Sequence, residues 1–231
     1  MITFVLILAI SSLFVNPKKI YKKHSRYYRT LLNISTQLAV WIMRIKVHVS
    51  GLEKLPKGTR FLLVQNHRSK FDPILTWYVL RKYDLAFLSK EENMHIPIFG
   101  RIIRKCCFMS IDRKHPGRAM ETVNTAVELL KDDQVSIGVY PEGTRNTTQE
   151  PLLPFHNSMF KIAQNADVPI VVMACHGTSA VKDNFPKKKS HVYFEVTGVL
   201  KPEDIKGLKT NVIGDEVARQ ILDSPIFRKS L

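Results

Sequence analysis

The chain opens with an uncharged apolar run that is followed at once by a basic cluster. Residues 2–15 (ITFVLILAISSLFV) carry no charge, and lysines begin at Lys18. As a helix, these 14 residues would extend about 21 Å, less than the ~30 Å hydrocarbon core of a bilayer. The pattern favours a helix that enters one leaflet, with the basic residues at the lipid headgroups.

A cleaved signal peptide is the alternative interpretation of this run. No charged residue precedes it, and residues 14–17 (FVNP) are not a small-x-small cleavage site. Positive charge directly after an apolar segment places the main body on the cytoplasmic side. We therefore expect a monotopic protein on the cytoplasmic face of the cell membrane.

A second apolar periodicity, of about 3.6 residues, runs through residues 27–43 (YYRTLLNISTQLAVWIM). Its apolar positions are Leu31, Ile34, Leu38, Trp41 and Ile42. This pattern predicts an amphipathic helix. The apolar face of this helix either packs on the rest of the protein or lies in the membrane interface beside the first helix. We expect residues 1–44 to form an N-terminal, membrane-associated two-helix segment.

From residue 45 onward, short apolar runs alternate with helical patterns. The predicted strands are residues 60–65, 84–89, 106–111, 135–140, 169–174 and 191–199. The predicted helices are residues 73–81, 117–131, 158–166 and 211–222. This alternation predicts an α/β domain over residues 45–231, with a mostly parallel sheet sandwiched by helices.

Composition and charge narrow the function classes. The 231 residues are 45% hydrophobic and 24% charged, which is typical of one folded domain with an appendage. The net charge is +15, and residues 1–50 contain eight basic residues and no acidic one. Such a segment attracts phosphates of nucleic acid or of anionic lipid. The apolar N-terminus, and the lack of a helix-turn-helix, zinc or RNA-binding motif, argue against nucleic acid as a partner.

The cysteine residues indicate neither a disulfide framework nor a metal site. An odd, small number of them argues against a disulfide framework. Cys106, Cys107, Cys175 and His176 lack an ordinary zinc-ligand spacing. We expect them to be buried strand residues, and no metal site is predicted.

The first candidate catalytic residues follow the strand predicted at residues 60–65. Residues 66–73 (NHRSKFDP) contain His67 and Asp72 at the carboxyl end of that strand, where sites of open α/β sheets lie. Asp followed by Pro is typical of a helix N-cap and first helical residue. A helix that begins at Pro73 leaves a loop that can fold Asp72 back onto the imidazole. The Asp would then fix the tautomer of a basic His67; the plainer alternative is a helix cap beside a loop histidine.

The second candidate motif, for ligand binding, follows the strand predicted at residues 135–140. Residues 140–145 (YPEGTR) combine a glycine, which lets a ligand approach the backbone, with an arginine whose fork suits phosphate oxygens. Pro-Glu-Gly alone is an ordinary turn. Two such blocks about seventy residues apart, in this order, point to a site more strongly than either one does.

These blocks resemble the lysophosphatidic acid acyltransferase family (1-acylglycerol-3-phosphate O-acyltransferases), within the glycerolipid acyltransferase superfamily. The resemblance covers roughly residues 50–180. Its four blocks are the His-x4-Asp block at residues 66–72; Lys90-Glu91 with residues 96–100 and 111–113; residues 140–145; and residues 168–171. The chain departs from the usual pattern at residues 155–158 (FHNS), where the family shows Lys and Gly, and at Val172, where a second proline is common.

The resemblance implies an acyl transfer to lysophosphatidic acid that gives phosphatidic acid in phospholipid synthesis. It implies that His67 takes a proton from the sn-2 hydroxyl as this attacks an acyl thioester, while Asp72 orients His67. The residues that it implies for phosphate binding are Glu142, Gly143, Thr144, Arg145, Lys90 and Arg113, with Arg145 foremost. The residues that support the motifs are Asn66, Ser69, Pro141 and Pro169.

The partners that the resemblance implies are the membrane surface, lysophosphatidic acid and the acyl donor. The donor is acyl-CoA or acyl carrier protein, and no further cofactor is expected. Another lysophospholipid or a lyso-aminolipid is the alternative acceptor, although the intact Glu-Gly-Thr-Arg favours a phosphomonoester. A serine hydrolase that uses Ser69 is the nearest rival enzyme, but Ser69 is two residues from His67 and the chain has no Gly-x-Ser-x-Gly elbow.

Overall fold

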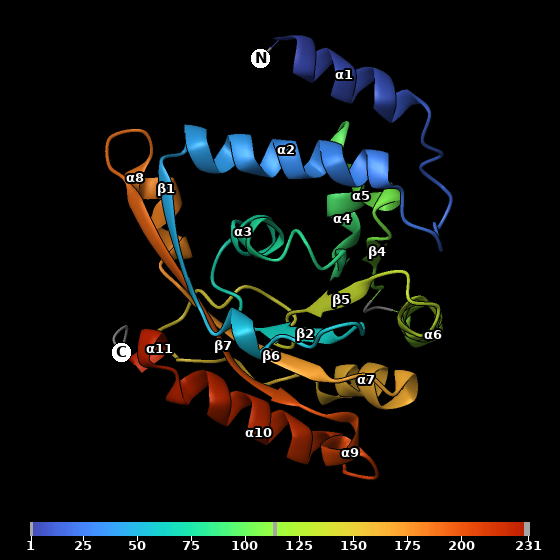
Figure 1. Cartoon of the computed structure of the whole chain (residues 1–231), viewed down its shortest axis with the longest axis vertical. Coiled ribbons are helices and arrows are strands. Elements are labelled where there is room, and N and C mark those ends of the chain that lie inside the picture. The colour runs from blue at the N-terminus through green and yellow to red at the C-terminus, as the bar shows by residue number, and fades with distance from the viewer. Residues whose placement is uncertain (1, 113–114, 229–231) are drawn as a thin grey trace.

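Seven strands form one sheet in the computed structural model, which describes residues 2–112 and 115–228 (Figure 1). The strands are β1 (Ile45–Ser50), β2 (Leu62–Gln65), β3 (Leu85–Ser89), β4 (Met109–Ser110), β5 (Ser136–Val139), β6 (Ile170–His176) and β7 (Ser190–Leu200). Their order across the sheet is β1-β7-β6-β2-β5-β3-β4. Strands β2 to β6 are parallel, β7 is antiparallel to β6, and β1 is parallel to β7. The predicted α/β fold with a mostly parallel sheet is confirmed.

Helices cover both faces of the sheet. The α-helices are α1 (Ile2–Leu13), α2 (Arg26–Ile42), α3 (Asp72–Val79), α4 (Glu91–Met94), α5 (Phe99–Lys105), α6 (Pro116–Lys131), α7 (Lys161–Ala166), α8 (Val181–Asn184), α9 (Pro202–Ile205), α10 (Thr210–Asp223) and α11 (Pro225–Arg228). Short 3₁₀ turns are η1 (Leu52–Lys54), η2 (Asn157–Phe160) and η3 (Thr178–Ala180). In Figure 1, α2 and α3 lie on one side of the sheet, and α7 and α10 lie on the other.

The central strands are buried on both faces because each face carries a helical layer. Along β2, Leu62 and Val64 belong to the core shared with α6, α7 and α10. Phe61, just before β2, and Leu63 belong to the core shared with α2, α3 and α5. Successive side chains of a strand point to opposite faces, so a continuous apolar run supplies both cores. This arrangement leaves the carboxyl ends of β2, β5 and β3 along one edge of the sheet.

Three element predictions need correction. The strand expected at residues 106–111 is only Met109–Ser110, because Cys106 and Cys107 end α5 and turn the chain, the latter with φ at 64°. The edge strand Ile45–Ser50 was missed because it alternates apolar residues with Lys, His and Ser and is half open to solvent. The helix expected at residues 158–166 begins as the 3₁₀ turn η2.

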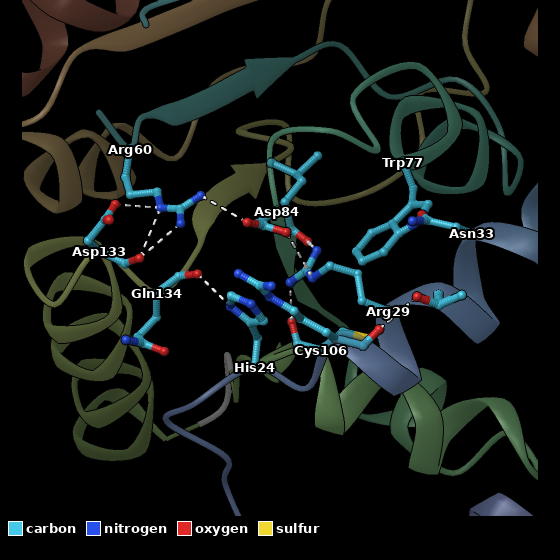
Figure 2. Close-up of polar contacts among 12 residues, drawn as sticks. His24, Arg29, Asn33, Arg60, Trp77, Asp84, Cys106, Asp133 and Gln134 are labelled. Carbon is cyan, nitrogen blue, oxygen red and sulfur yellow. Dashed lines mark hydrogen bonds and ion pairs between the residues drawn. The ribbon is translucent and has the colours of Figure 1, made fainter. Parts of the chain in front are cut away.

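Helix α2 is fastened to the domain through a buried arginine. The Arg29 guanidinium donates to the carbonyl oxygens of Leu85 (3.0 Å) and Cys106 (3.3 Å) and pairs with Asp84 (Nε to Oδ1, 3.3 Å). It also lies 4.8 Å from the centre of the Trp77 ring on α3. Figure 2 shows Arg29 among these partners. The apolar periodicity of α2 does not predict that Arg29 is buried, because Arg29 is charged and is not part of the apolar pattern.

The apolar stripe predicted for α2 is divided between the core and the surface. Leu31 is buried against the domain, whereas Ile34 and Trp41 are exposed, Trp41 by 75%. Helix α1 is more exposed still, with Phe14 just after it 78% accessible. Among residues 2–112 and 115–228, none of the helices combines the length and apolar character needed to cross a bilayer.

Candidate active site

His67 and Asp72 meet in the loop between β2 and α3. The Nδ1 atom of His67 lies 2.7 Å from Oδ2 of Asp72. The His67 side chain is 16% exposed and that of Asp72 is 1% exposed. With Nδ1–H donated to the carboxylate, the Nε2 lone pair of the neutral ring is available to accept a proton. The predicted folding of Asp72 back onto the imidazole is confirmed.

The capping role predicted for Asp72 is wrong. Helix α3 begins at Asp72 itself, and its N-cap residue Phe71 makes no side-chain cap. The Oδ2 atom of Asp72 instead accepts the backbone N–H groups of Arg68 and Ser69, each at 2.7 Å. The carboxylate therefore faces the preceding loop and not the helix. Three donors on one oxygen hold a negative charge directly behind His67.

Two aromatic rings support the imidazole. The Tyr140 ring is stacked on His67, with centroids 4.2 Å apart, and Phe87 of β3 is stacked on Tyr140 at 5.7 Å. A side chain at Gly138 would collide with the Phe87 ring, so this glycine leaves the room that the stack needs. Burial raises the pKa of the Tyr140 phenol well above its usual range, and the Asp72 charge adds to this shift. The hydroxyl therefore stays neutral beneath the site.

The Glu142 carboxylate is turned inward and holds two loops together. It is buried, and its two oxygens accept the backbone N–H groups of His67 (2.6 Å) and Leu153 (2.9 Å). Burial raises the pKa of this carboxyl, and the two N–H groups oppose the shift. Phosphate binding predicted for Glu142 does not fit this position, because both oxygens are engaged and their charge would repel an anion. The residue instead fastens the His67 loop to the loop after β5.

The turn after β5 brings Arg145 to the surface. Gly143 donates its N–H to the carbonyl oxygen of Tyr140 (2.9 Å) and has φ at +70°, a conformation that glycine adopts without strain. The backbone N–H of Asn146, next to Arg145, donates to the carbonyl oxygen of His67 at 2.7 Å. Thr144 and Arg145 are exposed. The Arg145 side chain is therefore open to solvent within one residue of a direct contact with the His67 backbone.

The residues expected to support the motifs occupy different parts of the sheet. Asn66 joins the ends of β2 and β6, since its amide donates to and accepts from the backbone of Cys175 at 2.9 and 2.8 Å. Ser69 is buried in the His67 loop, and its Oγ accepts the N–H of Phe71. Pro141 is buried in the turn after β5. Pro169 directly precedes β6, about 20 Å along that strand from the site edge, and its carbonyl oxygen accepts the N–H of Leu62.

Of the further cationic candidates, Lys90 is not brought to His67. Lys90 follows β3, which is two strands, or about 10 Å, from β2. It lines a separate surface hollow of about 670 Å³ between α4, β4 and α6, together with Arg104 and Thr122. Arg113 lies outside the described residues. Arg145 therefore lies next to the His67 loop, whereas Lys90 does not.

The structure describes no metal-binding cluster. Within residues 2–112 and 115–228, no group of three or more His, Cys, Asp or Glu side chains is placed to hold a metal ion. Cys106, Cys107 and Cys175 are buried free thiols. Burial raises the pKa of Cys106 to about 12 and that of Cys107 to about 11. These thiols therefore remain protonated and unreactive near neutral pH.

Comparison with known proteins identifies the family. The model of the family described as "Acyltransferase" matches residues 46–176, more than half of the chain. This chain belongs to the acyltransferase family. The matched region of this family member contains β1 except for its first residue, all of β2 to β6, and both loops of the candidate site.

Several relatives are named 1-acyl-sn-glycerol-3-phosphate acyltransferase. The protein from Bacillus subtilis (strain 168) is 29% identical over 64% of this chain and 71% of its own length. The one from Ovis aries, of the alpha type, is 28% identical over 82% and 65%, and the one from Cocos nucifera is 26% identical over 78% and 58%. This acyltransferase-family chain spans about half the length of the plant relatives that it matches.

A solved structure shares the fold. The 1-acyl-sn-glycerophosphate (LPA) acyltransferase PlsC from Thermotoga maritima superposes with a TM-score of 0.67 at 23% identity. The match covers 95% of this chain and 87% of that one. The similarity therefore extends beyond the family region to almost the whole described chain.

The sequence predictions gave no individual role to two residues that are important for the site geometry. Tyr140 was noted only as part of its block, although its ring supports His67. Arg68 was not singled out, although its guanidinium reaches the carbonyl oxygens of Thr148, Glu150 and Pro151. An aromatic residue at the end of a strand, directly before a turn, was a usable signal for Tyr140. No local pattern points to Arg68, because its partners are about eighty residues away.

Proposed function

We propose that this protein transfers a fatty acyl group from an acyl thioester to the free sn-2 hydroxyl of lysophosphatidic acid and so gives phosphatidic acid in phospholipid synthesis. The observation that carries the proposal is the hydrogen bond between His67 Nδ1 and Asp72 Oδ2 at the carboxyl end of the central strand β2. The names of the relatives support this choice of substrate.

In the proposed reaction, His67 is the general base. Its Nε2 takes the proton of the acceptor hydroxyl while the hydroxyl oxygen attacks the thioester carbonyl carbon. The tetrahedral intermediate then collapses, the carbon–sulfur bond breaks, and the leaving thiolate takes the proton from the imidazolium. Asp72 holds the ring in the required tautomer and stabilises the imidazolium charge. The Tyr140 ring keeps the imidazole plane from rotating away.

Arg145 binds the acceptor phosphate in this proposal. Its guanidinium is exposed, and a planar fork pairs well with two phosphate oxygens. Thr144, the residue before it, is also exposed and carries a hydroxyl group. Since Asn146 is bonded to the His67 backbone, a phosphate held by Arg145 would lie near the hydroxyl that His67 activates.

The N-terminal segment attaches the protein to the cytoplasmic face of the membrane in this proposal. Helix α1 and the residue after it expose large apolar side chains, among them Ile2, Leu13 and Phe14. Six Lys and Arg residues follow between Lys18 and Arg29. Apolar insertion combined with a basic cluster is what makes peripheral attachment stable. The acceptor lipid could then enter without its acyl chain crossing water.

The test is a direct assay of acyl transfer. Purified protein is incubated with vesicle-borne lysophosphatidic acid and either acyl-CoA or acyl carrier protein, and the products are identified by mass. Phosphatidic acid is the expected product, and the thioester consumed identifies the donor. Lysophosphatidylcholine and a lyso-aminolipid serve as competing acceptors. Efficient acylation of either of these, without phosphatidic acid formation, would contradict the proposed substrate.

A further inference from the structure

The two loops that form the site are joined by several hydrogen bonds. One loop, residues 66–71, carries His67; the other, residues 140–153, carries Arg145. Glu142 accepts N–H groups from both loops, and the Asn146 N–H donates to the His67 carbonyl oxygen. These bonds fix the start of the second loop and its end at Leu153. The segment in between, residues 147–152, contains no helix or strand.

Arg68 holds this intervening segment. Its Nη1 donates to the carbonyl oxygen of Thr148 (3.0 Å), and its Nη2 donates to those of Glu150 (3.0 Å) and Pro151 (3.1 Å). One side chain thus satisfies three backbone carbonyls that lie 80 to 83 residues away along the chain. The planar fork of arginine suits such a set of acceptors, whereas a lysine offers a single ammonium.

The Asn146 side chain completes the structure of the segment. Its Oδ1 accepts the N–H and the hydroxyl of Thr148 at 3.0 and 2.8 Å, and its Nδ2 donates to the carbonyl oxygen of Glu150 at 2.8 Å. The segment is therefore a compact turn. Among the described residues, the hydrogen bonds that reach it from outside its own loop come from the Arg68 guanidinium, while Leu152 packs against the core. Because Arg68 directly follows His67, displacement of the general-base loop would be transmitted to the Arg145 loop.

We propose that Arg68 is a positioning residue: by holding residues 148–151 it acts with the Glu142 and Asn146 hydrogen bonds to keep the Arg145 loop at a fixed distance from His67, and thereby contributes to the selectivity for the acceptor. The inference rests on the proposed function. In lysophosphatidic acid the reactive hydroxyl and the phosphate are on neighbouring carbon atoms. The group that activates the hydroxyl and the group that binds the phosphate must then stay a constant few ångströms apart. Three of the five Arg68 N–H groups are engaged by the turn, so its role is to hold the turn and not to bind the phosphate.

Hydrogen exchange tests the structural part of the proposal without any substrate. The backbone N–H groups of Asn146, Thr148, Glu150 and Leu153 are all hydrogen-bonded and serve as reporters. In Arg68→Ala we expect them to exchange about tenfold faster, the effect of losing one to two net hydrogen bonds. Lys70→Ala removes an exposed cation from the same loop and is the matched control, with exchange unchanged.

Kinetics tests the functional part. Arg68→Ala should raise the KM for lysophosphatidic acid about tenfold and leave the KM for the thioester within about twofold. It should also reduce the preference for lysophosphatidic acid over lysophosphatidylcholine. Arg68→Lys should lie between wild type and Arg68→Ala, because it keeps the charge without the fork.

Two results would overturn the positioning role. One is unchanged exchange at the four reporters with an unchanged acceptor KM. The other is an equal loss with both substrates together with a lower melting temperature, which is the signature of general destabilisation. Absence of acyl transfer by the wild-type protein would instead refute the proposed function, and the exchange measurement would still decide whether Arg68 holds the turn.

Discussion

At the scale of single residues, the arrangement around Asp72 determines which His67 nitrogen can accept a proton. One carboxylate oxygen receives the imidazole Nδ1 and two backbone N–H groups. The carboxylate is thereby held in the orientation that selects the Nδ1–H tautomer of the neutral ring, whose lone pair is on Nε2. The pairing of these two residues could be anticipated from the sequence, whereas the direction of the carboxylate could not, because it depends on the path of the loop.

Replacement of His67 is the first test at this scale. We expect His67→Ala to abolish acyl transfer and to leave the fold intact, with kcat lowered by about 10²–10⁴. Asp72→Asn should be nearly as severe, since an amide cannot stabilise the imidazolium. Steady-state kinetics on variants with a native circular dichroism spectrum makes the measurement. More than a tenth of wild-type turnover in His67→Ala would contradict the assignment.

Arg145 should affect the acceptor and not the donor. Loss of a charge-assisted contact costs about 1.5–3 kcal/mol, or roughly 10–150-fold in kcat/KM for lysophosphatidic acid. Arg145→Lys should also be impaired, because a point charge does not replace the fork. The measurement is kcat/KM for each substrate in turn. Full efficiency of Arg145→Ala would place the phosphate site elsewhere.

Glu142 should give a pH-dependent contribution to stability. Burial raises the pKa of this carboxyl above its ordinary value of 4.5, so the folded protein keeps the proton longer than the unfolded chain does. The stability that it contributes is complete below pH 4.5 and falls as pH rises through the raised pKa. Denaturant unfolding of wild type and Glu142→Gln between pH 4 and pH 8 measures this slope. A constant difference between the two proteins would refute the assignment.

At the scale of elements, α2 illustrates how a charged residue can decide packing. Its apolar periodicity predicted the helix correctly, but the helix lies with Arg29 inward and Trp41 outward. Arginine can be buried here because Asp84, two carbonyl oxygens and the Trp77 ring surround its guanidinium (Figure 2). Such partners come from β3, α3 and the end of α5. No pattern within α2 contains this information.

Removing this anchor should destabilise the protein. Arg29→Ala leaves the carbonyl oxygens of Leu85 and Cys106 without their donors, and we expect a loss of about 3 kcal/mol in the free energy of unfolding. Arg26→Ala, an exposed arginine at the start of the same helix, is the matched control and should change stability by less than about 0.5 kcal/mol. Equal effects of the two substitutions would show that Arg29 does not anchor α2.

At the scale of the whole molecule, the proposed membrane attachment depends on the exposed N-terminal helix and the basic residues that follow it. Deletion of residues 1–26 should move the protein largely into the soluble fraction and lower activity on vesicle-borne substrate. Replacement of Lys18, Lys19, Lys22 and Lys23 by Gln should weaken binding to anionic vesicles more than to neutral ones, since each contributes about 1 kcal/mol at an anionic surface. Co-sedimentation with vesicles at low and high salt measures both effects.

Protease protection of a tag at the N-terminus distinguishes docking from crossing. A tag on the same side of the membrane as residues 50–231 agrees with a helix that enters one leaflet. A tag on the opposite side would refute the docking proposal.

The sequence by itself determined the fold class, the positions of most strands and helices, and the pairing of His67 with Asp72. These features depend on residues close in sequence, such as side-chain periodicity and a loop of five residues. Tertiary structure decided that Arg29 is buried and that the Glu142 carboxylate points inward. It also decided that Tyr140 stacks on His67 and that Arg68 is hydrogen-bonded to the Arg145 loop. Each of these joins segments that are at least about fifty residues apart, where partners are set by how the elements pack and not by local pattern.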